Sequence, residues 1–175
     1  MSQRDSGYQR KAHDLYETPE WVTLALLPHL PERIRDVWEP ACGSGKMVRA
    51  LNTKYGTVYG TDIDFGRDFL TEKTASGYDA IITNPPYALA ETFIARSILL
   101  MGGTRGAVAM LLRTDYDHAN TRRLLFADEP IFSKKVVLTK RIRWFEDSKG
   151  SPSFNHAWFI WDWKHQGPPT LAYGP

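Results

Sequence analysis

One stretch decides the predicted fold: DVWEPACGSGKMVRAL, residues 36–51. Its first four residues, 36–39, read as a short strand, and a proline follows them. Two glycines, Gly43 and Gly45, then predict a tight turn, and apolar residues at helical spacing predict a helix over 46–55. Glycines let a ligand approach the backbone closely, and the first amides of a helix attract an anion. The stretch therefore predicts a ligand-binding turn between a strand and a helix.

The same turn excludes two common phosphate-binding motifs. A P-loop needs a glycine where Pro40 stands and a serine or threonine where Met47 stands. A dinucleotide-binding fingerprint needs a third small residue at the position of Val48. What remains is a turn for a ligand with a small anionic group and a ribose. Asp62, at the end of the next predicted strand, can accept both ribose hydroxyls.

Strands and helices alternate along the rest of the chain. Further strands are predicted at 58–61, 79–83, 106–112, 136–144 and 157–163. Helices are predicted at 19–27 with Thr18 as N-cap, at 89–101 and at 117–126. This alternation favours an α/β fold with a doubly wound, mostly parallel, Rossmann-like sheet. The last two strands have no helix between them and predict an antiparallel pair at the C-terminal edge.

The length of the chain is that of one domain and too short for two: 175 residues, 42% hydrophobic and 24% charged. We expect a flexible segment at 1–12, the folded domain at 13–166, and a Pro/Gly-rich tail at 167–175 that forms no regular element. No apolar run approaches the roughly 20 residues that span a bilayer, and residues 1–11 lack a signal-peptide pattern. These observations predict a cytoplasmic protein with no membrane partner.

Cysteine content and net charge narrow the function further. Cys42 is the single cysteine, so it cannot form an internal disulfide or alone build a zinc site, and no metal site is predicted. The net charge is +2, from 22 basic and 20 acidic residues. This value is too small to identify a nucleic-acid binder, so such binding must come from local clusters of positive charge.

The turn Asn84-Pro85-Pro86-Tyr87 follows an apolar strand and carries specific chemistry. An exocyclic amine of a nucleobase is a weak nucleophile because its lone pair is delocalised into the ring. Two acceptors, the Asn84 side-chain oxygen and the Pro85 carbonyl, would bind its two hydrogens and localise that lone pair, while the prolines hold the acceptors in place. Tyr87 offers a face on which a flipped base can stack, worth ~1–3 kcal/mol. A sulfonium methyl is an electrophile that fits this arrangement, and no covalent enzyme intermediate is required.

Together these motifs resemble the S-adenosylmethionine-dependent amino-methyltransferases of DNA, in particular the adenine-N6 group with an NPPY motif. The matching stretches stand in the family's order: Glu17 to Pro19, Glu39 to Gly45, Gly60 to Asp64, Asp68 to Leu70 and Asn84 to Tyr87. The resemblance implies a class I methyltransferase fold, and it implies that the target base is held by Asn84, Pro85, Pro86 and Tyr87.

The resemblance also implies a binding site for S-adenosyl-L-methionine, with a role for each matching position. The methionine part would contact Tyr16, Thr18, Glu39, Pro40, Cys42, Gly43 and Gly45. The ribose would be held by Asp62. The cofactor's adenine would lie against Asp68 and Phe69.

The sequence departs from the family in two places. The stretch between Asp62 and Asp79 is too short for the usual helix and third strand, which we expect to be reduced to fragments around 66–71. The family's DNA enzymes usually carry a separate target-recognition domain, and we expect none in this chain. Target specificity would then come from loops, from a second copy in a homodimer, or from a separate specificity partner.

A basic cluster stands ahead of two aromatic residues in the last third of the chain. Its members are Lys134, Lys135, Lys140, Arg141 and Arg143, together with Arg122 and Arg123 on the preceding predicted helix. On the predicted strand, Arg141, Arg143 and Phe145 share one face. A basic face with an aromatic residue suits a phosphate backbone and a displaced base. Candidate substrate-binding residues are therefore Tyr87, Arg141, Arg143, Trp144 and Phe145. Either Trp144 or Phe145 matches the aromatic that the family places against the base, and the alternative is a solvated charged strand with Trp144 in the core.

The function predicted from these motifs is methyl transfer from S-adenosylmethionine to the N6 amine of adenine in DNA. The same turn suits any planar amine, so RNA bases and a protein glutamine amide are alternative substrates. A different class also stays open, a catalytically idle subunit that binds cofactor or nucleic acid within a larger assembly.

Overall fold

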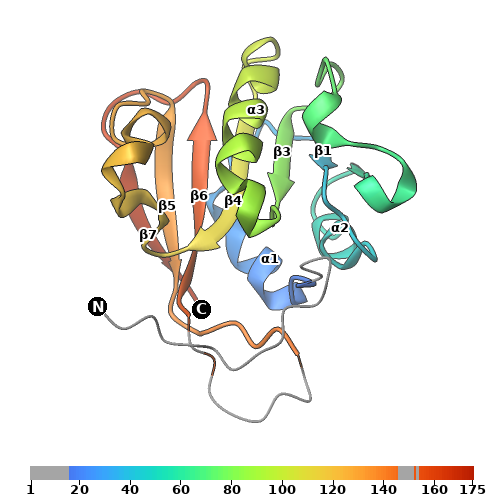
Figure 1. The fold of residues 1–175 in the computed structure, drawn as a ribbon, viewed down its shortest axis with the longest axis horizontal. Helices are drawn as coiled ribbons and strands as arrows, with labels where there is room; N and C mark the ends of the chain where they lie inside the picture. The colour runs from blue at the N-terminus through green and yellow to red at the C-terminus, as the bar shows by residue number, and fades with distance from the viewer. Residues whose placement is uncertain (1–15, 146–151, 153) are drawn as a thin grey trace.

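The computed structural model describes residues 16–145, 152 and 154–175. In this part of the chain, a seven-stranded sheet is covered by helices on both faces (Figure 1). The strands are β1 (Asp36–Glu39), β2 (Thr57–Gly60), β3 (Ala80–Thr83), β4 (Ala107–Arg113), β5 (Phe132–Leu138), β6 (His156–Asp162) and β7 (Thr170–Gly174). The α-helices are α1 (Glu20–Leu26), α2 (Lys46–Leu51) and α3 (Ala90–Gly102). Short 3₁₀ turns are η1 (Leu27–His29), η2 (Ile63–Phe65), η3 (Phe69–Thr71), η4 (Tyr87–Leu89), η5 (Tyr116–His118) and η6 (Asn120–Leu125).

The sheet order is β2-β1-β3-β4-β6-β5-β7. Strands β1 to β4 run parallel to one another, and β6 runs antiparallel to both of its neighbours, β4 and β5. The predicted doubly wound, mostly parallel sheet is therefore confirmed, as is the antiparallel pairing of the two predicted C-terminal strands.

Alternation along the strands divides the apolar residues between two cores, one on each face of the sheet. Val37 points to the face covered by α1 and α2, whereas its neighbour Trp38 points to the face covered by α3. Ile82 and Ile81 divide in the same way. Both faces of the sheet are covered by packed apolar side chains, which explains why the central strands are almost wholly apolar.

The C-terminal edge differs from the prediction. Residues Thr170–Gly174 were expected to form no regular element, but they form strand β7. This strand pairs in parallel with β5, so β7 and not the antiparallel pair is the edge of the sheet. The edge of β5 supplies hydrogen-bonding groups that local composition does not reveal. The predicted bounds 136–144 are also wrong, because β5 ends at Leu138 and Val137 is its last residue paired with β6. Residues 139–145 leave the sheet, so the predicted shared face of Arg141, Arg143 and Phe145 does not exist.

Two helix predictions need correction as well. The N-cap of α1 is Pro19, and Thr18 is buried instead of capping. The segment predicted as a helix at 117–126 contains only the 3₁₀ turns η5 and η6. It offers no apolar stripe of helical length, since Leu124 is exposed, and its short polar side chains compete for backbone groups.

The helix and strand that the family usually has between β2 and β3 are reduced to fragments, as predicted. This stretch holds only the 3₁₀ turns η2 and η3, and within the described residues β2 is the outer strand of the sheet on this side. None of the helices in the described ranges is long and apolar enough to cross a membrane.

Candidate active site

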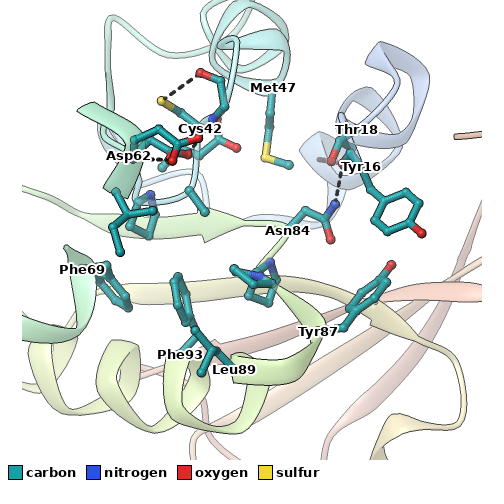
Figure 2. A pocket seen from close by; sticks show the side chains of 18 of the residues that line it. Tyr16, Thr18, Cys42, Met47, Asp62, Phe69, Asn84, Tyr87, Leu89 and Phe93 are labelled. Atoms are coloured by element: carbon teal, nitrogen blue, oxygen red, sulfur yellow. Dashed lines mark hydrogen bonds between the residues drawn. The ribbon is translucent and has the colours of Figure 1, made fainter. Parts of the chain in front are cut away.

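A cavity of about 670 Å³ lies at the carboxyl ends of β1, β2 and β3 (Figure 2). Parallel strands bring their carboxyl ends to one edge of the sheet, and the loops that follow them meet there. The lining comes from five segments at or after the strand ends, together with Phe93 of α3. These segments contribute Tyr16 to Thr18, Glu39 to Gly43 with Lys46 and Met47, Asp62 to Asp64, Asp68 to Leu70, and Asn84 to Leu89.

The glycine turn after β1 is held in place by Asp62. The Asp62 carboxylate accepts from the backbone N–H of Gly43 at 2.8 Å and from that of Asp64 at 3.0 Å. Gly43 and Gly45 have φ values of 48° and 80°, in the left-handed region that favours glycine. Gly60 at the end of β2 allows a close approach to this turn, because a Cβ there would lie 2.8 Å from a methyl of Val48. Asp62 therefore shapes the turn besides facing the cavity.

Glu39, the last residue of β1, is a buried acid on the cavity wall with 2% of its surface exposed. Burial raises the pKa of Glu39 well above its usual range, and the nearby Asp62 carboxylate raises it further. Its Oε2 has no hydrogen-bond partner within the described residues. An unpartnered buried carboxyl oxygen is costly, so this position fits a ligand that brings a positively charged donor.

The Asn84 to Tyr87 turn forms the neighbouring wall of the cavity (Figure 2). The Nδ2 of Asn84 donates to the backbone carbonyl of Tyr16 at 3.1 Å. Its Oδ1 is buried and has no partner among the described residues. Figure 2 shows the side chains of Tyr16 and Tyr87 lying on the same side of Asn84. The turn thus presents an oriented hydrogen-bond acceptor beside an aromatic ring.

His156, at the start of β6, lies behind this wall and contacts it through Tyr87, and the sequence did not indicate this residue. Its Nε2 lies 3.0 Å from the hydroxyl oxygen of Tyr87. Burial lowers the pKa of His156 to about 4, with Arg113 contributing. No sequence motif surrounds this histidine, and the contact depends on β6 inserting between β4 and β5.

The predicted cofactor residues come together in the structure. All of them line the cavity except Gly45, which is the N-cap of α2. Asp68 caps η3 by accepting from the N–H of Leu70 at 2.9 Å, and Phe69 packs against Trp38 and Phe93. The four predicted catalytic residues, Asn84 to Tyr87, line the same cavity.

The other predicted substrate-binding residues do not line the cavity. Trp144 and Phe145 pack against the ring of Tyr16, with centroid distances of 5.5 and 5.7 Å. The guanidinium of Arg141 is exposed and donates to the side-chain oxygen of Asn155 and to the carbonyl of Pro152. Arg143 is also exposed.

Several cations of the predicted basic cluster are paired with acids. Lys135 contacts Asp117 at 2.9 Å. Arg122 and Arg123 form ion pairs with Glu91 and Asp128, both at 2.6 Å. Local pairing of this kind reduces the positive potential that those side chains offer to a phosphate backbone.

No family model and no curated protein matches the chain. A Listeria monocytogenes protein described as a class I S-adenosylmethionine-dependent methyltransferase superposes over 96% of this chain and 67% of its own, with a TM-score of 0.63 and 12% identity. The chain has the class I methyltransferase fold.

Two further structures share the class I fold. The 23S rRNA methyltransferase ErmE matches 85% of this chain and 68% of its own, with a TM-score of 0.60 and 18% identity. The type I restriction-modification methyltransferase subunit from Streptococcus thermophilus matches 86% of this chain, with a TM-score of 0.56 and 14% identity. This chain spans only 45% of that subunit.

Within the described part of the chain, no group of three or more His, Cys, Asp or Glu side chains could hold a metal ion.

Proposed function

We propose that this protein transfers a methyl group from S-adenosylmethionine to the exocyclic N6 amine of adenine in DNA. The observation that carries the proposal is the buried, unpartnered Oδ1 of Asn84, which stands beside Tyr87 on the cavity wall. An oriented acceptor next to an aromatic face suits an aromatic amine, whose N–H it binds while the ring stacks.

The cavity residues fit S-adenosylmethionine. About 670 Å³ is within the usual range for a small-molecule site. The unpartnered Oε2 of Glu39 would accept from the ammonium group of the methionine part, beside Thr18 and Gly43. Each carboxylate oxygen has more than one lone pair, so Asp62 can hold the ribose while it still accepts from Gly43 and Asp64.

The adenine of the cofactor would lie at Asp68 and Phe69, on the side of the cavity formed by η3. Asp68 has one oxygen bonded to the N–H of Leu70 and a second that can accept from an amine. When bound, S-adenosylmethionine supplies an electrophilic methyl group on a sulfonium sulfur.

The chain's own residues prepare the target amine for this methyl group. Asn84 Oδ1 and the Pro85 carbonyl would each accept one amine hydrogen, which favours a pyramidal nitrogen with a localised lone pair. Tyr87 would hold the flipped base by stacking. The nitrogen would take the methyl as the bond from that methyl to the sulfonium sulfur breaks, which leaves a neutral thioether, and one amine proton would pass to solvent. Asn84 orients hydrogens but takes no proton, because a neutral amide is not a base at ordinary pH.

The choice of DNA is supported by the sequence motifs and by the fold of the Streptococcus thermophilus subunit, which its name assigns to a restriction-modification system. RNA is the second candidate, since the similarly folded ErmE is named as an rRNA methyltransferase. Both candidates use the same acceptor and stacking residues, so product chemistry separates them.

Transfer of a labelled methyl group to a mixture of genomic DNA, total RNA and protein tests the proposal. We expect label in DNA, recovered as N6-methyladenine after digestion, and none with Asn84→Ala, which should still bind S-adenosylmethionine. Label in RNA or in glutamine would overturn the DNA assignment. Cofactor binding with no transfer to any polymer would instead favour an idle subunit, and no cofactor binding would refute the proposal outright.

A further inference from the structure

The base-stacking residue of the proposed site is tied to β6, a strand that lies two places from β3 in the sheet. Tyr87 follows β3, whereas His156 begins β6, and 69 positions of sequence separate them. The Tyr87 hydroxyl oxygen and the His156 Nε2 lie 3.0 Å apart, and the two rings are nearly parallel, at an angle of 21°. The hydroxyl of Tyr87 therefore ends against a group that belongs to a different element.

His156 is built into the protein as a fixed and neutral partner. Only 2% of its surface is exposed, and its backbone is in register with Arg113 on β4. Burial and the Arg113 charge keep the imidazole neutral near pH 7, since its pKa is lowered to about 4. A neutral imidazole has one N–H and one acceptor nitrogen, so it can take part in a hydrogen bond with a hydroxyl in either tautomer.

Two further aromatic residues complete a closed ring of contacts with this pair. The ring of Trp144 lies edge-on to the rings of His156 and Tyr16, with centroid distances of 5.3 and 5.5 Å. The ring centroids of Tyr16 and Tyr87 are 6.4 Å apart. We name these four side chains the aromatic quartet: Tyr16, Tyr87, Trp144 and His156. Asn84 is connected to the aromatic quartet by its hydrogen bond to the Tyr16 carbonyl. The same group of residues therefore positions both the acceptor oxygen of Asn84 and the stacking ring of Tyr87.

A tyrosine stacks on a base through its ring, and stacking does not require the hydroxyl. At Tyr87 the hydroxyl instead reaches a buried partner, which restricts rotation of the ring about its side-chain bonds. Holding a side chain in one rotamer before binding avoids the entropy cost of ordering it afterwards.

We propose that His156 is a positioning residue, which holds Tyr87 through its hydroxyl so that the tyrosine ring is ready to receive the target base. This inference rests on the proposed function, because it assumes that Tyr87 stacks on a nucleobase. His156 does not line the cavity, so it acts on the base only through Tyr87.

A double-mutant cycle tests the pairing. Tyr87→Phe keeps the ring and removes the hydroxyl, and His156→Leu removes the nitrogen. We expect each to lower kcat/KM for genomic DNA on the order of tenfold, mostly through KM, and the double variant to be no worse than either single one. His156→Gln, which offers a polar atom near the position of Nε2, should restore most of the loss. Tyr78→Phe serves as the matched control, since Tyr78 packs on Trp38 and does not line the cavity.

Additive losses in the double variant, or a Tyr87→Phe enzyme with unchanged kcat/KM, would overturn the role of His156. Tyr87→Phe decides the matter even if His156→Leu fails to fold, because Tyr87 is only half-buried. If the wild-type protein methylates no nucleic acid, the proposed function fails first and this inference falls with it. Loss of cofactor affinity with every His156 variant would indicate general destabilisation and contradict positioning.

Discussion

The side-chain amide of Asn84 donates from Nδ2 to the backbone carbonyl of Tyr16, at 3.1 Å, although 68 positions of sequence separate the two residues. An amide carries its donor and acceptor in one rigid plane, so this bond also fixes the direction of Oδ1. Oδ1 stands buried on the cavity wall without a partner among the described residues. The segment before α1 therefore orients the acceptor on which the proposed chemistry depends.

Asn84→Asp separates the acceptor from its orientation. The carboxylate keeps an acceptor oxygen but loses the donor, and it repels the carbonyl of Tyr16. We expect the single-turnover rate of methyl transfer to fall on the order of 100-fold, and Asn84→Ala to lose at least as much. Cofactor affinity, measured by calorimetry, should stay within about twofold for both variants. An Asn84→Asp enzyme at the wild-type rate would show that the Tyr16 contact is dispensable.

Glu39→Gln should change how cofactor affinity depends on pH. Burial raises the pKa of Glu39, so in the free protein the group stays protonated above its usual range and must ionise to pair with an ammonium group. In the wild type, affinity should rise as the pH climbs above the usual titration range of a glutamate and this carboxyl loses its proton. The glutamine variant should bind more weakly and with little pH dependence in calorimetry over the same range. Parallel profiles for the two proteins would exclude Glu39 as the ammonium partner.

The part of the site on parallel strands could be predicted from sequence, and the reason is geometric. Glu39, Asp62 and Asn84 each stand at or just after the end of a short strand. Parallel strands place these ends side by side, so residues far apart in the chain meet without any knowledge of tertiary packing. The cavity contains all three.

The C-terminal third could not be predicted in the same way. The contact of His156 with Tyr87 depends on β6 lying between β4 and β5, an order that strand patterns do not encode. Strand β7 forms because β5 offers a free edge, in spite of the prolines at 168 and 169. The ion pair of Arg122 with Glu91 joins segments 31 positions apart, so the basic cluster in the sequence is less basic in space.

Arg141→Ala combined with Arg143→Ala should weaken DNA binding through the phosphate backbone. Both side chains are exposed, and the two acceptors of Arg141 at Asn155 and Pro152 are neutral, so they leave its charge available. We expect the slope of log binding constant against log salt to become shallower by up to about two. Cofactor affinity should not change.

Arg122→Ala with Arg123→Ala is the matched control for that experiment, because it also removes two positive charges. These arginines are already paired with Glu91 and Asp128, so their loss should change the salt slope less. Fluorescence anisotropy with a labelled duplex from 50 to 300 mM salt, roughly the range in which phosphate contacts are resolved, provides the slopes. Equal slopes for the wild type and the Arg141/Arg143 variant would remove these two residues from the DNA interface.

Acid should destabilise the fold through His156. Its pKa is lowered to about 4 in the folded protein from a usual value of 6.5, so the unfolded chain binds this proton more tightly. The stabilising contribution is complete above pH 6.5 and is lost as the pH falls toward 4, with a loss of about 2 kcal/mol by pH 5.

Urea denaturation of the wild type and of His156→Gln, at pH 7.5 and at pH 5, measures this loss of stability. The other titrating groups, Glu39 and His29 among them, are common to both proteins, so the difference between the two pH dependences isolates His156. If both proteins lost the same stability on acidification, the buried imidazole would not be the group that titrates.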